Sequence, residues 1–283
     1  WCDIGFNFGG VPQSVSEFAN IYNKVFGLKV YMNQTTGTLL VEDKSQREIV
    51  FKNWKSAVPI MVHAEGKALE EAIRLAKKYK KRLHVCHIVA SQLPIIEKAK
   101  KQKIKITCEV CPHHLFLTKS DEKKLGPLAV MKPPLISKNE VKDLWANIEK
   151  IDMISTDHAP HTLAEKFDKN GPKFGVPGLE TTIPLFFEAI DSGRISLSQF
   201  IKMTSTNPRK IFNLPQLKNS YVEVDISRKF KINNNLFTKS KWTPFNKATG
   251  AGKVIKVVIG GKTVFENGKF IGRPAGKVIY PNK

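Results

Sequence analysis

The sequence contains little cysteine, few acidic residues and no long apolar run, and each shortage excludes a class of protein. Four cysteines in 283 residues are too few for a disulfide scaffold, and Cys108 and Cys111 form a CxxC without the second CxxC of a zinc ribbon. We therefore expect reduced thiols and a cytoplasmic location. No apolar run approaches the roughly 18 residues of a membrane-spanning helix, so the sequence predicts no membrane partner.

Acidic residues are strongly outnumbered by basic ones. The chain has 25 Asp and Glu against 46 Lys and Arg, which gives a net charge of +21. Two lysine clusters, at 77–82 and 98–105, each cover a predicted helix end, where lysine complements the helix dipole. Neither cluster contains the interleaved aromatic residues that stack on bases, so nucleic-acid binding is disfavoured. The charge indicates either a lysine-rich solvated surface or attraction of small anionic substrates.

The start of the chain lacks the features of a processed leader. Trp1-Cys2-Asp3 has neither a charged leader nor a signal-like apolar core, and the first residue is not methionine. We expect the sequence to be a piece of a longer protein.

Residues 1–214 alternate between strand-like and helix-like patterns. The predicted strands are Asp3–Phe8, Leu28–Met32, Pro59–His63, Leu83–His87, Ile104–Val110 and Met153–Thr156. The predicted helices are Val15–Phe26, Lys67–Tyr79, Leu93–Lys101, Lys138–Ile148, Leu179–Ala189, Leu197–Met203 and Asn207–Phe212. This alternation favours parallel strands in an α/β barrel. A closed (β/α)₈ barrel needs eight strands, so we expect the first two to precede Trp1.

The pattern changes near the C-terminus. Tyr221–Asp225 and Val254–Ile259 read as strands, and Gly260-Gly261 predicts a hairpin turn into Lys262–Phe265. Residues 232–253 read as a loop. We therefore predict two domains, a partial barrel over 1–214 and a β-rich C-terminal extension over 215–283.

Chemically capable side chains stand at the ends of three predicted strands. His63, His87 and Asp157 each follow a short apolar run, and parallel strand ends in such a barrel meet at one mouth. A lone strand-end histidine is more often a satisfied polar residue than a ligand. Three such positions together favour a hydrolytic zinc centre, because zinc prefers imidazole and carboxylate ligands in catalytic sites.

Several neighbouring residues allow two readings. Lys29 ends an apolar strand, either as a rim lysine whose ammonium reaches water or as a carbamylated metal ligand. Cys86 is more simply a small packed side chain than a ligand, and Glu109 is a further strand-end carboxylate. His113-His114 are expected to pack the following helix, and His84 lies at the wrong end of its strand for catalysis.

Taken in chain order, several short sequence motifs of this chain resemble the dihydroorotase family of the amidohydrolase superfamily, most closely the dihydroorotase domain of CAD-type pyrimidine multienzymes. The resemblance spans essentially the whole chain. The carrying strings are Gly27-Leu28-Lys29-Val30-Tyr31, Val62-His63-Ala64-Glu65, His84-Val85-Cys86-His87, Thr107 to Leu115, Asp157-His158-Ala159-Pro160-His161-Thr162, Pro177-Gly178-Leu179-Glu180-Thr181, Asn207 to Phe212 and Trp242-Thr243-Pro244-Phe245.

The resemblance implies zinc-dependent, reversible cyclisation of N-carbamoyl-L-aspartate to L-dihydroorotate. The metal ligands it implies are Lys29, His63, His87, Asp157, Cys86 and Glu109, and the substrate contacts it implies are His161, Lys132, Thr35, Pro177 and Gly178. Lys29 would be carboxylated and bridge two zinc ions, and Asp157 would bind one zinc and move the proton. Cys86 and Glu109 match positions for a third zinc, and Thr35 lies on a mobile loop over Asn33–Leu40.

The sequence departs from the family in two places. The family's His-x-His-x-Arg on the first barrel strand is absent, which leaves one zinc with only Lys29 and Asp157. Lys132 stands where the family has Arg or Asn, and Lys is a point charge rather than a bidentate partner for a carboxylate. Truncation is the simplest explanation of the first departure.

The resemblance also implies a homo-oligomer and linkage, covalent or not, to carbamoyl phosphate synthetase and aspartate transcarbamoylase. Two other readings stay open: a non-catalytic dihydroorotase-like domain that serves as a structural part of a multienzyme, and another cyclic-amide hydrolase such as a dihydropyrimidinase.

Overall fold

The computed structural model describes residues 1–216, 218–274 and 276–282. Its central sheet contains six parallel strands in chain order, as the sequence predicts. The strands are β1 (Asn7–Gly9), β2 (Gly27–Tyr31), β3 (Ile60–His63), β4 (Leu83–Val85), β5 (Ile106–Val110) and β6 (Met153–Ile154). Within the described ranges, neither β1 nor β6 pairs its outer edge with a further strand of this sheet.

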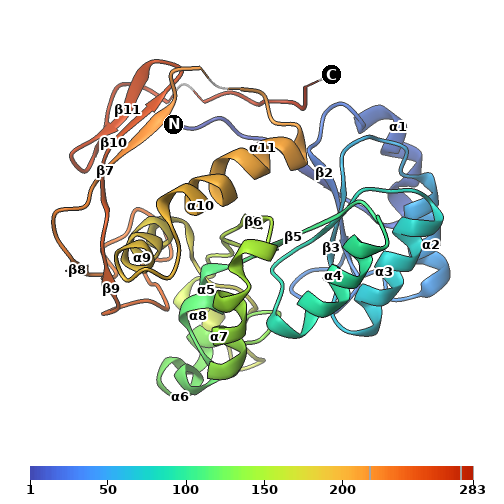
Figure 1. Cartoon of the computed structure of the whole chain (residues 1–283), viewed down its shortest axis with the longest axis horizontal. Helices are drawn as coiled ribbons and strands as arrows, with labels where there is room; N and C mark the ends of the chain where they lie inside the picture. The colour runs from blue at the N-terminus through green and yellow to red at the C-terminus, as the bar shows by residue number, and fades with distance from the viewer. Residues whose placement is uncertain (217, 275, 283) are drawn as a thin grey trace.

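Helices follow the strands along the chain, and the first few of them line one side of the sheet (Figure 1). They are α1 (Phe18–Ile21), α2 (Lys44–Asn53), α3 (Lys67–Lys78), α4 (Leu93–Lys101), α5 (Pro112–Phe116), α6 (Glu122–Leu125), α7 (Lys138–Ala146), α8 (Leu163–Lys166), α9 (Leu179–Asp191), α10 (Leu197–Ile201) and α11 (Asn207–Phe212). Helix α3 shows why such a segment packs as a helix. Its buried residues Leu69, Ala72, Leu75 and Ala76 are spaced so that they form one apolar face. Helix α7 begins at a capping box in which Ser137 accepts from the amide of Glu140.

Short 3₁₀ and π segments complete the barrel part. The 3₁₀ turns are Pro12–Glu17, Ala90–Gln92, Lys119–Asp121, Gly126–Ala129 and Ile148–Lys150, and a π segment, Lys202–Thr206, joins α10 to α11. The helix predicted over Val15–Phe26 is wrong in extent, because the chain there forms a 3₁₀ turn and then only α1. The first strand is also misplaced by the prediction: Ile4 pairs with Val278 instead, and the sheet begins at Asn7.

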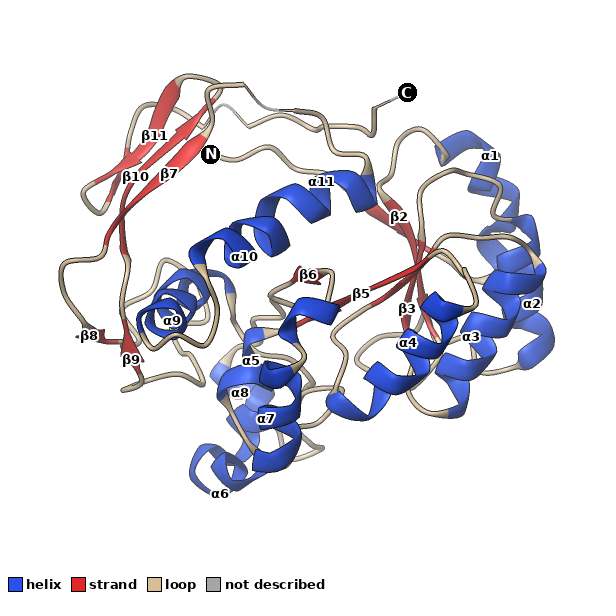
Figure 2. Cartoon of the chain, in the orientation of Figure 1, coloured by secondary structure: helices blue, strands red, loops and turns tan. Residues whose placement is uncertain are grey.

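The C-terminal residues build a second, antiparallel sheet, which stands apart from the parallel strands in Figure 2. Its order is β12–β11–β10–β7, made of β7 (Tyr221–Asp225), β10 (Lys253–Ile259), β11 (Lys262–Glu266) and β12 (Lys269–Phe270). A two-stranded pair, β8 (Phe230–Lys231) with β9 (Thr249–Gly250), lies at the edges of the stretch predicted to be a loop. Among the described residues, no helix is long and apolar enough to cross a membrane.

Candidate metal centre

The structure brings His63 and His87 into contact at the carboxyl ends of neighbouring strands. His63 is the last residue of β3, and His87 follows β4. His63 Nδ1 and His87 Nε2 lie 3.0 Å apart, and both rings are buried. Burial and the nearby Lys29 and Lys132 ammonium groups lower the pKa of His63 to about 4. Burial first, and then Lys29, hold the pKa of His87 well below its usual value, so both rings are neutral, as metal ligands must be.

The histidine pair fits two corners of a zinc site. Two nitrogens that each lie 2.0–2.1 Å from a tetrahedral zinc are about 3.3 Å apart, close to the spacing seen here. The outer nitrogens, His63 Nε2 and His87 Nδ1, are buried without a hydrogen-bond partner. His63 Nε2 lies 3.8 Å from a Glu65 oxygen, a group of the kind that orients ligating histidines.

The described residues do not complete that site with unmodified side chains. No group of three His, Cys, Asp or Glu in this part of the chain is placed to hold a metal ion. A complete site therefore needs ligands of another kind, such as a modified lysine, or a carboxylate that moves toward the histidine pair. Lys29 and Asp157 are the residues that could supply these two kinds of ligand.

Lys29 lies in β2, on the same mouth as the histidine pair. Its Nζ lies 5.1 Å from the centre of the Tyr31 ring. Burial disfavours its ammonium form, but Cys86, Glu109 and Tyr31 outweigh this effect and raise the pKa of Lys29. In this state the amine keeps its proton, whereas reaction with CO₂ requires the neutral amine. Carboxylation of Lys29 would therefore have to displace that proton.

Asp157 follows β6 and adopts a left-handed backbone with φ 41°, and His87 does the same with φ 37°. Non-glycine residues in this region are uncommon and cluster at functional sites. Burial raises the pKa of Asp157, Lys29 opposes the rise and Glu109 adds to it. A half-buried carboxyl with a raised pKa at a strand end is suited to exchanging a proton with a bound molecule.

Cys86 and Glu109 do not form a metal-holding group with His63 among the described residues. Cys86 is buried in an apolar cluster with Phe26 and Met61, and burial raises the pKa of its thiol to about 12. Glu109 accepts from His84 Nε2 at 3.0 Å. This contact gives His84 a structural partner that the sequence does not predict, because β5 places Glu109 beside it only once the strands pair.

The predicted substrate contacts meet around Phe174. His161 Nε2 donates to the Phe174 carbonyl at 3.1 Å, and Lys132 Nζ lies 5.4 Å from the Phe174 ring centre. The Phe174 amide donates to Thr36 Oγ1 at 3.1 Å, so the loop that carries Thr35 reaches the same place. Thr35 itself lines a cavity of about 220 Å³.

Pro177 and Gly178 precede α9, and the sequence does not predict what holds them. His158 Nδ1 accepts from the amides of Gly178 and Leu179, at 3.1 and 3.3 Å. This imidazole caps the amino end of α9 and fixes the turn against the strand end of β6. The sequence offers one signal for a role of His158, its position in the histidine-rich stretch 157–161.

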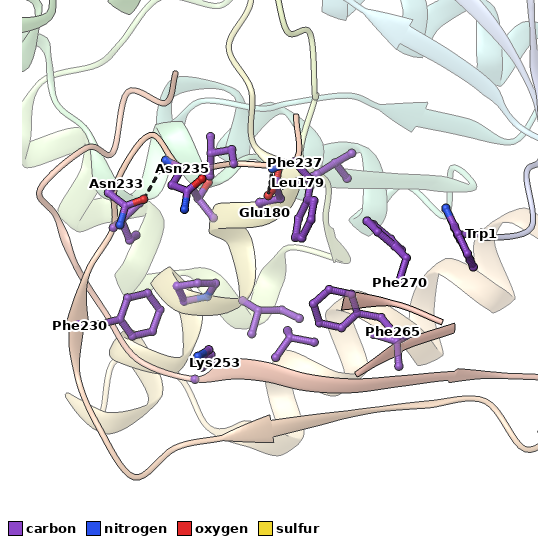
Figure 3. A pocket seen from close by; sticks show the side chains of 18 of the residues that line it. Trp1, Leu179, Glu180, Phe230, Asn233, Asn235, Phe237, Lys253, Phe265 and Phe270 are labelled. Atoms are coloured by element: carbon purple, nitrogen blue, oxygen red, sulfur yellow. Dashed lines mark hydrogen bonds between the residues drawn. The ribbon is translucent and has the colours of Figure 1, made fainter. Parts of the chain in front are cut away.

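Another cavity lies elsewhere, between α9 and the second sheet (Figure 3). It has a volume of about 720 Å³ and includes Trp1, Phe230, Phe237, Phe265 and Phe270 in its walls. None of the predicted metal ligands or substrate contacts lines it. Aromatic and aliphatic side chains form much of its wall, and the polar residues Glu180, Lys231, Asn233, Asn235 and Lys253 also line it.

Two relatives share most of the chain. It is 38% identical over 276 residues to the Multifunctional protein CAD of Squalus acanthias, covering 96% of this chain and 12% of that protein. It is 36% identical over 303 residues to the Dihydroorotase of Pyrococcus horikoshii, covering 98% of this chain and 67% of that protein. The chain thus spans a small part of the first relative and about two thirds of the second. No protein-family model matches it.

Solved structures support the same fold. The L-hydantoinase (dihydropyrimidinase) of Arthrobacter aurescens superposes with a TM-score of 0.92 at 21% identity, covering 99% of this chain and 74% of that chain. The inactive dihydroorotase-like domain of the Chaetomium thermophilum CAD-like multifunctional protein gives 0.82 at 23% identity, covering 99% and 79%. The fold is that of the amidohydrolase barrels, and by its sequence relatives the chain belongs to the dihydroorotase family.

Proposed function

We propose that this chain forms the dihydroorotase part of its protein and interconverts N-carbamoyl-L-aspartate and L-dihydroorotate. The observation that carries the proposal is the pair of buried, neutral imidazoles, His63 and His87, whose nitrogens face each other at 3.0 Å at the barrel mouth. Membership of the dihydroorotase family supports the choice of substrate.

His63 and His87 would hold one of two zinc ions. Asp157 would bind the other, and Lys29, once carboxylated, would be a ligand of both. Zinc bound there would polarise the reacting carbonyl and activate water near neutral pH. Cys86 and Glu109 are proposed for a third zinc only if Glu109 leaves His84, to which it is bonded here.

The chain's own residues account for proton transfer and substrate binding. In hydrolysis, Asp157 accepts a proton from the attacking water and returns it to the leaving ring nitrogen, and in ring closure it runs these steps in reverse. Lys132 and His161 would bind the substrate carboxylates, and their shared contact at Phe174 supports this assignment. The loop 33–40 and the turn at Pro177 and Gly178 would shield the bound ring from water.

We also propose a division of the chain at residue 214. Residues 1–214 would contribute six of eight barrel strands, and 215–283 would belong to a small composite β domain. The open outer edges of β1 and β6 in the described ranges support this. The ligands of the family's His-x-His-x-Arg would then come from strands other than these six.

We also propose a larger assembly. The protein would be cytoplasmic, form homo-oligomers and be linked to carbamoyl phosphate synthetase and aspartate transcarbamoylase, as the family resemblance implies, and the multifunctional nature of the Squalus acanthias relative supports such a linkage.

The test uses the protein as it is made in the cell, assayed with zinc and carbamoyl aspartate or dihydroorotate. We expect turnover, and we expect His63→Gln to lose both turnover and bound zinc. His113→Gln is the matched control, because His113 is equally buried but lies in α5 rather than at the end of β3 or β4. Equal loss of zinc in both variants would contradict the site.

The resemblance to an inactive dihydroorotase-like domain favours one alternative, a non-catalytic structural domain. Absence of turnover in the zinc-loaded wild type, with its fold intact, would establish that alternative. Turnover of a hydantoin or dihydrouracil in preference to dihydroorotate would instead assign a dihydropyrimidinase-like activity.

A further inference from the structure

Lys166 is a fully buried lysine that the proposed reaction does not use. It ends the short helix α8, and its side chain has no exposure to solvent. Its Nζ donates to three main-chain carbonyls: Val130 at 2.8 Å, Lys173 at 2.8 Å and Gly175 at 3.0 Å. An ammonium without a carboxylate partner is costly to bury unless all its protons are bonded, and here all three are.

These three carbonyls belong to two segments, one that carries the predicted substrate contact Lys132 and one that touches both Lys132 and His161. Val130 lies two residues before Lys132. Lys173 and Gly175 flank Phe174, whose carbonyl accepts from His161 and whose ring lies under Lys132 Nζ. A single ammonium therefore joins the Lys132 loop to the segment 173–175.

The segment 173–175 is held from other sides as well. The Gly175 amide donates to the Val130 carbonyl at 3.0 Å. Gly175 has φ 132°, and a Cβ there would lie 2.4 Å from Ala159 Cβ, so the segment packs directly against the loop that carries His161. Trp242 donates from Nε1 to the His161 carbonyl at 2.7 Å, and its ring lies 5.7 Å from Lys166 Nζ.

We propose that Lys166 is a positioning residue that fixes Lys132, Phe174 and His161 relative to one another. Its role in substrate binding rests on the proposed function; its role as a clamp between the two segments does not. Burial lowers the pKa of Lys166 to about 8, while the three carbonyls favour the charged form, so the clamp is charged at neutral pH.

The test compares Lys166→Met with Lys169→Met in the protein as it is made in the cell. Methionine keeps much of the length of the side chain and removes the donors, and Lys169 is an exposed lysine in the turn that follows α8. Under the proposal, Lys166→Met raises KM for dihydroorotate roughly tenfold and changes kcat by less than about twofold, because it loosens binding without touching the reacting atoms. Lys169→Met should leave both constants unchanged.

Amide hydrogen exchange supplies a readout that needs no turnover. In Lys166→Met the amides of Phe174 and Gly175 should exchange about tenfold faster or more, while those of β3 and β4 stay protected. Unchanged exchange in the segment 173–175 would overturn the clamp. Faster exchange with an unchanged KM would overturn its role in binding, and a wild type without turnover would overturn the proposed function alone.

A measurement on the wild type covers the case in which Lys166→Met does not fold. The Gly175 amide bonds to Val130 across the clamp, whereas the Gly171 amide closes an exposed turn to the Asp168 carbonyl at 3.0 Å. The proposal requires Gly175 to exchange far more slowly than Gly171. Equal rates would show that the clamp does not hold.

Discussion

At the scale of single residues, the site consists of side chains whose surroundings suit the binding of an ion or a substrate better than a purely structural role. His63 and His87 are neutral, buried and face each other, and each keeps one nitrogen without a partner. Asp157 and His87 adopt left-handed backbones, which cost free energy without any gain in the core. Such positions are expected where geometry serves a bound ion or substrate.

Asp157→Ala tests the proton-transfer role. In the protein as it is made in the cell, we expect the variant to lose turnover while zinc content falls only in part, because His63 and His87 remain. General acid–base groups typically contribute roughly 10²–10⁴-fold in rate, so a variant that keeps more than about a tenth of the wild-type rate would contradict the assignment. Metal analysis on the same sample shows how much of the lost rate comes from lost zinc and how much comes from the lost proton-transfer group.

Lys132 tests how the substrate carboxylate is held. We expect Lys132→Ala to raise KM by about 10- to 150-fold, because a hydrogen bond to a charged group contributes roughly 1.5–3 kcal/mol. Lys132→Arg should leave KM equal or lower, since arginine binds carboxylates with two parallel bonds. Steady-state kinetics on both variants gives the answer, with the exposed Lys124→Ala as control. If Lys132→Ala binds carbamoyl aspartate as well as wild type, another cation holds the carboxylate.

At the scale of elements, close packing between loops replaces regular structure around the site. Gly175→Ala tests this against Gly171→Ala. Both glycines have positive φ, 132° and 108°, so both variants carry backbone strain of about 1–3 kcal/mol. Of these two positions, only Gly175 would bring the new Cβ against another atom, Ala159 Cβ at 2.4 Å.

Overpacking of that kind costs about 1–3 kcal/mol more. We expect the free energies of unfolding of the two variants to differ by about this amount. Denaturant unfolding should therefore show Gly175→Ala to be the less stable of the two. Equal free energies of unfolding would mean that the loop 157–161 moves aside without cost.

The elements with strong periodicity were predictable from the sequence, and those without it were not. Helices Leu93–Lys101 and Asn207–Phe212 begin and end where predicted. Helix α2 was not predicted, because its buried face includes Arg47, whose guanidinium donates to the Val41 and Met32 carbonyls. The alternation of Ile4 and Phe6 suggested a strand, yet both are more than half exposed, so the pattern there does not reflect a buried face.

Prediction of the site was limited by contacts between distant residues. Residues at strand ends could be assigned to one mouth, because parallel topology alone brings His63 to His87. The Glu109–His84 pair, the His158 cap and the Lys166 clamp each join residues whose meeting depends on strand register or loop path. Local sequence carries no periodic signal for such contacts.

At the scale of the whole molecule, the ligand count limits what this chain can do by itself. All seven histidines lie at or after residue 63. Among the described residues, the His63–His87 pair is joined by no third His, Cys, Asp or Glu that would complete a metal site. A second zinc would have only Lys29 and Asp157, fewer than the three protein ligands usual in catalytic sites. In the described ranges, no further strand of this sheet pairs with the outer edge of β1 or of β6.

We therefore expect the 283-residue chain, expressed alone, to bind at most a single zinc ion and to lack dihydroorotate turnover above a metal-free blank. The reason is geometric, since two imidazoles can retain an ion, whereas orienting the substrate would need a second ion and a wall beside the open edges of β1 and β6 in the described ranges. Metal analysis after gel filtration, combined with an activity assay, measures both quantities. Supplying a segment that carries the family's His-x-His-x-Arg should restore turnover. Measurable turnover by the isolated chain would show that Lys29, His63, His87 and Asp157 suffice, and that the dihydroorotase reaction here runs on a smaller centre than the family pattern implies.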